Sequence, residues 1–226
     1  MSHFTVMVIG ANPEKQLAPF DENLEMPRYV KYTKEQLIEK GKKSIESYKN
    51  GTYATFLADK EAYKADCKND AHINYLENEF PKKLSLSDDE IYKNEIDDYE
   101  SEDVGGNGEV YSTYNPKSKW DWYSLGGRWS GMIKLKDGAS GEVGRGSLVM
   151  DNEAGIDQAK KGDIANFDGL TTFAILKDGE WFERGEMGWW GAVHDRKDDE
   201  TWNNEFKKLV GGLSDDTLIS IYDCHI

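Results

Sequence analysis

The stretch His3-Phe-Thr-Val-Met-Val-Ile9 decides the fold. When it is extended, even-numbered side chains lie on one face and odd-numbered side chains on the other, and both faces are mainly apolar. A strand with two apolar faces belongs in the middle of a sheet. Residues 217–224, Thr-Leu-Ile-Ser-Ile-Tyr-Asp-Cys, have the same pattern. We predict that both are central strands. Their pairing with each other is a hypothesis, because paired strands are usually close in sequence.

Three further strands and a helix are predicted in the second half of the chain. Residues 171–177 and 180–184 flank Asp178-Gly179, a two-residue turn that favours a tight hairpin. Residues 128–136 are predicted as another strand. Apolar residues then recur at helical spacing, which predicts a helix over about 200–211.

The first half of the chain is predicted to be helical. Thr33 and Gln36 have the spacing of a capping box, in front of a helix over about 34–49. Further helical stretches are predicted over 59–79 and, as a short acidic helix, over 88–98.

The glycine content changes near residue 104, since three glycines precede it and nineteen follow it. We predict a single α+β domain over residues 1–226, with a mixed or antiparallel sheet, helices on one face of that sheet, and a helical and acidic insertion over 50–110. A ferredoxin-like core is the nearest simple match to the predicted order of elements.

The composition predicts a soluble cytoplasmic protein. With 38% hydrophobic and 31% charged residues, the chain offers no membrane span and no signal peptide. Cys67 and Cys224 lie far apart without a metal-binding spacing, so we predict no disulfide framework, no metal site and no cofactor. The net charge of -15 would repel a phosphate backbone, which argues against direct binding of nucleic acid.

An acidic segment occupies residues 87–103, with nine carboxylates and one lysine. Its spacing is not that of an EF-hand calcium loop. We interpret the segment as a solvated surface. The alternative is an interaction surface for a partner protein, or a mimic of DNA.

All seven tryptophans lie after Lys119, and most fall in two blocks rich in glycine. The first block is Lys119-Trp-Asp-Trp-Tyr-Ser-Leu-Gly-Gly-Arg-Trp-Ser-Gly131. If it is extended, its first two tryptophans point the same way. Such rings, an arginine and closely approaching backbone amides would suit a base and a phosphate, although an aromatic core corner has the same composition. The candidate ligand-binding residues are Trp120, Trp122, Tyr123, Arg128 and Trp129.

The second block is Gly179-Glu-Trp-Phe-Glu-Arg-Gly-Glu-Met-Gly-Trp-Trp-Gly191. Along a strand, Trp181 and Glu183 would share one face, and Phe182 and Arg184 the other. The block adds Arg184, Trp189 and Trp190 as candidate ligand-binding residues, and Arg145 is a further candidate for phosphate.

The candidate acid–base residues are Glu183, Glu186 and His194, since neighbouring carboxylates and imidazoles can divide the acid and base roles of a hydrolysis. Solvated ion pairs are the alternative for the two carboxylates. Cys224 and His225 are adjacent on a predicted strand, so their side chains point to opposite faces and do not form a thiol–imidazole pair.

The two blocks and both ends of the chain resemble uncharacterised proteins of tailed bacteriophages and prophages. The matching ends are Met1-Ser-His-Phe-Thr-Val-Met-Val-Ile-Gly10, Gln16-Leu-Ala-Pro-Phe20 and Asp216-Thr-Leu-Ile-Ser-Ile-Tyr-Asp-Cys-His-Ile226. The resemblance implies no catalytic residue, because that family has no established activity. It implies a phage accessory protein in the cytoplasm of a bacterial host, where such proteins often counter host defence.

Three functions are therefore expected. The first is binding and sequestering a nucleotide-derived small molecule in a pocket of Trp, Arg and Glu side chains. The second is hydrolysis of such a signal by Glu and His side chains. The third is inhibition of a host defence protein through the acidic segment 87–103. If the tryptophan blocks form one pocket, Arg128 and Arg184 should both lie near tryptophan rings and a cavity.

Overall fold

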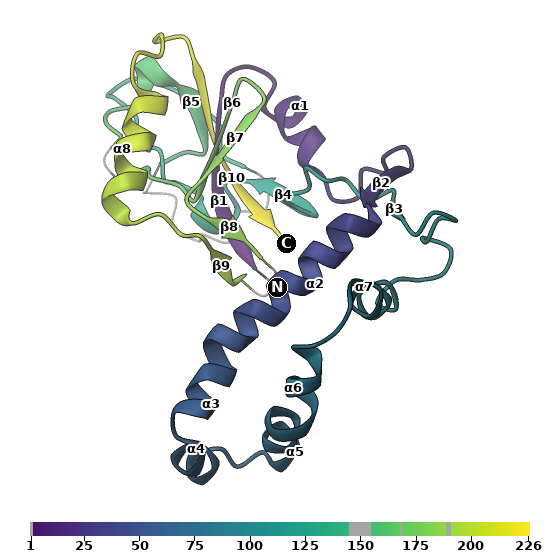
Figure 1. Cartoon of the computed structure of the whole chain (residues 1–226). Coiled ribbons are helices and arrows are strands. Elements are labelled where there is room, and N and C mark those ends of the chain that lie inside the picture. The colour runs from purple at the N-terminus through teal and green to yellow at the C-terminus, as the bar shows by residue number, and fades with distance from the viewer. Residues whose placement is uncertain (1, 145–154, 168, 189–190) are drawn as a thin grey trace. The chain divides into compact units, whose positions relative to one another are not determined.

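The computed structural model describes residues 2–144, 155–167, 169–188 and 191–226. Contacts divide the chain into two compact units. The first unit, Met1–Glu25 with Tyr114–Ile226, contains the main sheet, and the second, Met26–Thr113, is inserted into it (Figure 1). The inserted unit is thus longer than the predicted insertion over 50–110.

Six strands form a mixed sheet in the first unit. Their main order is β4-β10-β1-β6-β7, and β5 also pairs with β10. The strands are β1 His3–Ile9, β4 Trp122–Leu125, β5 Gln158–Lys160, β6 Ala174–Lys177, β7 Glu180–Glu183 and β10 Leu218–His225. Only the β1–β6 pair of this sheet is parallel in the described residues. The predicted α+β class is confirmed.

The two central strands that the sequence predicts also pair with each other. β1 and β10 are antiparallel over their full common length, from His3 opposite His225 to Ile9 opposite Ile219. β10 is buried from Ile219 onward, because it has hydrogen-bonded neighbours at both edges and packing on both faces. The pairing hypothesis is confirmed.

Each face of the sheet carries its own apolar core. Helix α8, Asp199–Val210, covers one face, where Trp202 and Phe206 pack near Met7. The opposite face is covered by α1, Pro13–Leu17, and the 3-10 helix η1, Ala18–Phe20. Figure 1 shows α8 and α1 on opposite sides of the sheet. The predicted helical cover is confirmed for α8, and the short helices α1 and η1 add a second layer.

The hairpin between β6 and β7 turns at the predicted dipeptide. Asp178 and Gly179 have φ values of 53° and 78°, which a tight hairpin turn requires and which these residue types tolerate. Trp181 packs on the α1 side and Phe182 on the α8 side, as predicted. β1 lies directly beside β6, whereas in a ferredoxin-like core another strand separates the first two parallel strands.

The prediction of a strand over residues 128–136 is wrong. Gly127–Trp129 form a short 3-10 helix, η4, and the rest of the segment makes only isolated bridges, such as Ile133 with Ile156. Gly126 and Gly127 have positive φ values of 74° and 50°. This turn prevents residues 128–136 from pairing continuously with a neighbouring strand.

The inserted unit is mainly helical. Its elements are β2 Tyr29–Tyr32, α2 Lys34–Tyr48, α3 Ala54–Ala58, α4 Lys60–Asp66, α5 Asp70–Asn74, α6 Phe80–Lys83, α7 Asp88–Ile96 and β3 Val110–Ser112, with π-helical turns η2 Lys49–Tyr53 and η3 Tyr75–Glu79. Thr33 and Gln36 form the predicted capping box. The predicted helical stretch 59–79 is divided, because the chain is extended at Cys67 and Asn69.

Three short elements complete the first unit: η5 Lys161–Asp163, β8 Glu186–Met187 and β9 Val193–His194. β8 and β9 form a separate two-stranded sheet. Of the helices in the described part of the chain, none has the length and apolar character needed to cross a membrane.

Candidate functional site

Ionisable side chains gather at one end of the sheet face that α8 covers. The odd-numbered residues of β1 and β10 point to this face, as the burial of Met7 and Ile221 in its core shows. The same alternation places His3 and Thr5 of β1, and Asp223 and His225 of β10, at the end of that face. Asp121 and Trp122 join them from the start of β4. We refer to His3, Asp121, Trp122, Asp223 and His225 as the histidine cluster.

The first pair of the histidine cluster joins the two central strands. Nδ1 of His3 lies 2.8 Å from Oδ1 of Asp223, and the two side chains are 10% and 3% exposed. Because an ionised carboxylate only accepts hydrogen bonds, Nδ1 is the donor. The pair therefore leaves Nε2 of His3 as the nitrogen that can exchange a proton with a ligand.

The second pair has the same form. Nδ1 of His225 lies 2.7 Å from Oδ1 of Asp121, and the His225 side chain is 6% exposed. The ring centres of His3 and His225 are 4.9 Å apart. Nε2 of His225 is buried, and among the described residues it has no hydrogen-bond partner. Since buried polar atoms nearly always have partners, this nitrogen is an available position for a polar ligand atom.

Trp122 forms the outer wall of the histidine cluster. Its ring stacks on His225 with centres 5.1 Å apart and planes 16° apart, and it meets His3 edge to face. Trp122 is nevertheless 43% exposed. The ring therefore orients the imidazole and leaves surface on which a flat ligand can stack.

The glycine turn of the first block supports the histidine cluster through its backbone. The N–H of Arg128 donates to Oδ2 of Asp223 at 3.0 Å. At Gly127 a Cβ would collide with Asp223, and at Gly126 with Asp157. The predicted close approach of backbone amides is present, but the groups that approach are the protein's own carboxylates. The Arg128 side chain is exposed.

Asp157 is the second carboxylate of this turn, and it is fully buried. It accepts hydrogen bonds from the N–H of Gly131 and of Gly144, each at 2.7 Å, and from Oγ of Ser130 at 2.9 Å. These bonds fix the path of the chain after β4. Asp157 therefore shapes the turn that holds Asp223.

A cavity of about 330 Å³ adjoins the histidine cluster on the same face. Its lining includes Thr5, Thr171, Arg184, Asp199, Trp202 and Asn203. Thr5 lies opposite Asp223 in the strand register, and Arg184 forms an ion pair with Asp199 at the start of α8. Nε of Arg184 is buried and has no partner among the described residues. We refer to this space as the Arg184 cavity.

The two arginines thus have different surroundings. Arg184 lies at a cavity with Trp202, as the pocket prediction requires. Arg128 is joined to the histidine cluster by its backbone, and its side chain is exposed and is not part of the described lining of the Arg184 cavity.

The other candidates of the first block lie in the two cores. Trp120 is buried on the α1 side, where Tyr123 packs edge to face against it. Trp129 packs against the core on the α8 side. The expectation that Trp120 and Trp122 point the same way is wrong, because the chain bends at Asp121 between them, so that Trp120 lies in the α1-side core and Trp122 contacts His3 and His225. Trp189, Trp190 and Arg145 lie outside the described residues.

The predicted acid–base residues are not members of the histidine cluster. Glu183 accepts from Nε1 of Trp181 at 2.8 Å and pairs with Lys119 at 2.7 Å, on the α1 side. Glu186 and His194 are exposed and face each other across β8 and β9.

Cys224 is separated from the histidine cluster by the sheet. It is fully buried on the α1 side, and burial raises the pKa of its thiol well above the usual range, with a further contribution from Asp223. Cys224 therefore stays a neutral thiol, and the predicted separation from His225 is confirmed.

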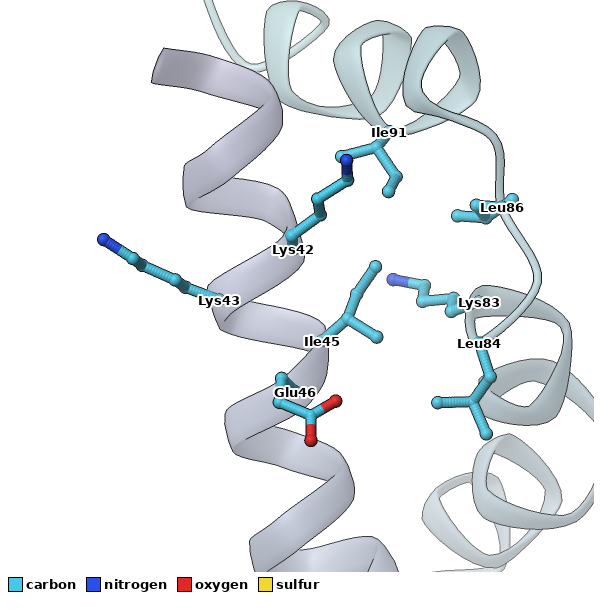
Figure 2. A pocket seen from close by; sticks show the side chains of 8 residues that line it. All are labelled: Lys42, Lys43, Ile45, Glu46, Lys83, Leu84, Leu86 and Ile91. Atoms are coloured by element: carbon cyan, nitrogen blue, oxygen red, sulfur yellow. The ribbon is translucent and has the colours of Figure 1, made fainter. Parts of the chain in front are cut away.

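In the inserted unit, lysines of α2 neutralise part of the acidic segment. The ion pairs are Lys34 with Asp89, Lys40 with Glu95 and Lys42 with Asp88. A cavity of about 470 Å³ lies nearby, with Ile45, Leu84 and Leu86 in its lining. Figure 2 shows Ile45 pointing from α2 towards the facing segment, while Lys43 points away. This lining combines aliphatic side chains with three lysines and Glu46.

His3, Asp121 and the pairing of His225 were not among the predicted site residues. The available signal was the register of the two central strands: once residues 3–9 pair with 217–224, His3 has to lie opposite the segment Asp223-Cys-His225. The described residues contain no group of three or more His, Cys, Asp or Glu side chains placed to hold a metal ion. No protein-family model, curated protein or solved structure matches the chain.

Proposed function

We propose that this protein hydrolyses a phosphoester bond of a nucleotide-derived molecule, with His3 and His225 as its general acid and base. The observation that carries the proposal is the pair of imidazoles 4.9 Å apart, each bonded through Nδ1 to a carboxylate. A carboxylate at Nδ1 fixes the tautomer and supports the imidazolium form when it arises.

Two such imidazoles can move both protons of a hydrolysis. The neutral ring takes a proton from water through Nε2 while the water oxygen bonds to phosphorus. The protonated ring gives its proton to the leaving oxygen as the phosphorus–oxygen ester bond breaks. The products are an alcohol and a phosphate, and exchange with solvent returns each ring to its starting state. General acid–base catalysis of this kind contributes about 10²- to 10⁴-fold in rate.

The surroundings favour a nucleotide as the source of the phosphoester. The exposed face of Trp122 can stack on a base, and the exposed guanidinium of Arg128 can reach a phosphate from beside the histidine cluster. The resemblance to phage accessory proteins supplies a setting for this proposal, in which a nucleotide signal of bacterial defence is destroyed in the host cytoplasm.

The test is a hydrolysis assay with candidate nucleotides, namely cyclic mono- and dinucleotides, ADP-ribose and NAD, with products separated by chromatography. We expect at least one compound to be cleaved, and His3→Ala and His225→Ala each to lower the rate by about 10²-fold or more. His194→Ala is the matched control, because it removes an exposed histidine outside the cluster, and it should keep the wild-type rate. Cleavage that survives both cluster variants would refute the acid–base assignment.

A second candidate function is binding of the same ligand without turnover. It is favoured by the burial of the His225 Nε2 atom, since a nitrogen closed off from water exchanges protons slowly but can still accept a hydrogen bond from a ligand. The same set of nucleotides distinguishes binding from hydrolysis. A ligand that is bound without turnover shifts the tryptophan fluorescence and is recovered intact.

A further inference from the structure

We infer that the Arg184 cavity binds the sugar diol of the ligand, so that the protein selects ribonucleotide chemistry over its deoxy counterpart. The inference rests on the proposed function, in which the ligand is a nucleotide phosphoester. It assigns a binding site to the sugar, the part of the ligand next to the phosphate. Thr5 lines the cavity and lies two residues from His3 along β1, which is about 7 Å of strand. This offset suits a sugar in the cavity and its phosphate at the histidines.

The cavity offers one donor that the protein leaves unused. Nη2 of Arg184 donates to Asp199, but Nε on the same edge of the guanidinium is buried without a partner among the described residues. An unsatisfied buried donor is costly and uncommon in a folded protein. A ligand oxygen placed against this edge would satisfy it.

Two further polar groups of the lining can donate additional hydrogen bonds. Oγ1 of Thr5 accepts from the N–H of Phe173 at 3.1 Å, so its own hydrogen remains available to donate. Thr171 donates to Oδ1 of Asn203 at 3.2 Å, which leaves the Asn203 amide group able to donate to a ligand. The cavity can therefore surround a group that both gives and takes hydrogen bonds.

The acidic residues at the start of α8 favour a hydroxyl group over an anion. Asp198, Asp199 and Glu200 bring three carboxylates to this end of the helix, and Arg184 is the cation that the described lining of the cavity places against Asp199. A second anion would have to displace Asp199 and would be repelled by its neighbours. A sugar hydroxyl instead accepts from Nε of Arg184 and donates to Asp199, which leaves their ion pair in place.

The side chain of Asp199 can adapt to such a ligand, because it is 82% exposed and its contact with Arg184 is made through Oδ1. Carboxylates accept hydrogen bonds from ribose hydroxyls in this way in dinucleotide-binding proteins. The cavity volume of about 330 Å³ is also at the size at which small-molecule sites begin.

The experiment compares the dissociation constants of AMP, 2′-deoxy-AMP, 3′-deoxy-AMP and inorganic phosphate by calorimetry. It is run with the wild type and in a His3→Ala background, where the ligand stays intact under the proposed mechanism. We expect AMP to bind about 10- to 100-fold more tightly than at least one deoxy analogue in both proteins, which is the effect of one hydrogen bond to a charged group.

Three variants test the assignment to this cavity. Asp199→Asn and Arg184→Lys should reduce the preference for AMP to less than about 3-fold, since the first weakens the acceptor and the second removes the Nε donor while keeping the charge. Glu200→Gln is the matched control, because it removes a neighbouring carboxylate of the same helix turn, and it should keep the preference. Thermal melting of each variant checks that it is folded.

The outcomes separate this inference from the proposed function. Equal binding of AMP and both deoxy analogues, no binding of AMP, or binding by phosphate alone would overturn the sugar site. A preference that persists unchanged in Asp199→Asn and Arg184→Lys would also overturn it. A preference for AMP that these variants abolish, in a protein that hydrolyses none of the nucleotides tested, would support the sugar site and refute the hydrolase.

Discussion

Nδ1 of His3 and Oδ1 of Asp223 lie 2.8 Å apart although 220 positions separate the two residues in the sequence. The contact depends on the β1–β10 register, which also brings His225 next to His3. A shift of this register by one residue would turn Asp223 and His225 of β10 to the face opposite His3 of β1. The register is fixed by the apolar cores on both faces, so the sheet itself positions the histidine cluster.

The Asp223 carboxylate should control the tautomer of His3. We expect the His3 imidazole of the wild type to carry its proton on Nδ1 in the neutral form, and Asp223→Asn to shift the proton towards Nε2. Asp223→Asn should also lower any hydrolysis rate by about 10²- to 10⁴-fold. The ¹⁵N chemical shifts of the imidazole nitrogens report the tautomer without a substrate. Asp216→Asn, at a highly exposed carboxylate, is the control. Unchanged His3 shifts in Asp223→Asn would contradict the assigned donor.

Asp157 should contribute more to stability than any surface carboxylate. Asp157→Ala leaves the partly buried N–H of Gly131 and the buried N–H of Gly144 without their acceptor, and we expect it to lower the free energy of unfolding by about 2–5 kcal/mol. Asp216→Ala, which breaks the exposed pair with Lys160, should cost less than about 1 kcal/mol. Urea denaturation measures both values, and similar losses in the two variants would argue against a structural role for Asp157.

Two glycines of the inserted unit should respond in opposite ways to the same substitution. A Cβ on Gly41 would lie 2.5 Å from Cγ2 of Ile91, whereas a Cβ on Gly51 would meet nothing within 4 Å. We expect Gly41→Ala to destabilise the α2–α7 contact by about 1–3 kcal/mol and Gly51→Ala to stabilise the helical segment by about 0.5–1 kcal/mol. Denaturation followed by helical circular dichroism distinguishes them. Stabilisation by both substitutions would mean that α7 does not pack closely on Gly41.

The two cysteines should differ in their reaction with maleimide at pH 8. Cys67 is partly exposed and should be labelled in the native protein, whereas Cys224 is fully buried and should be labelled only after denaturation. Because burial raises the pKa of the Cys224 thiol, the unfolded chain releases this proton first as the pH rises. Wild-type stability should therefore fall above about pH 8.5, relative to Cys224→Ala, by up to about 1.4 kcal/mol per pH unit. Rapid native labelling of both thiols would contradict this burial.

The sequence was sufficient for the elements whose signal is local. Alternation within residues 3–9 and 217–224, the Asp178-Gly179 turn and the capping box at Thr33 each depend on neighbouring residues, and each is present. The strand predicted over residues 128–136 is absent, because buried carboxylates elsewhere in the chain determine the path of this segment. No local pattern shows that Asp157 binds the amides of that turn.

The candidate site could not be predicted in the same way, because its residues come from separate parts of the chain. Asp121 meets His225 across 104 positions, and a single aspartate beside a tryptophan carries no distinctive motif. The composition of the tryptophan blocks suggested a ligand site, yet Trp120 and Trp129 pack in the two cores and Trp122 contacts the histidines. The number of tryptophans in a segment does not show which of them pack in a core and which lie at a functional site.

The central position of β10 has a consequence for synthesis on the ribosome. The inserted unit is one continuous segment, Met26–Thr113, so all of its contacts can form early in translation. The main sheet cannot close until residues 218–225 have emerged, because β10 joins β1 to both β4 and β5. Until then β1 exposes an unpaired apolar edge, of the kind that favours aggregation and binding by chaperones. The histidine cluster therefore cannot assemble before β10 has been synthesised, and any function that depends on the cluster has to wait for that strand.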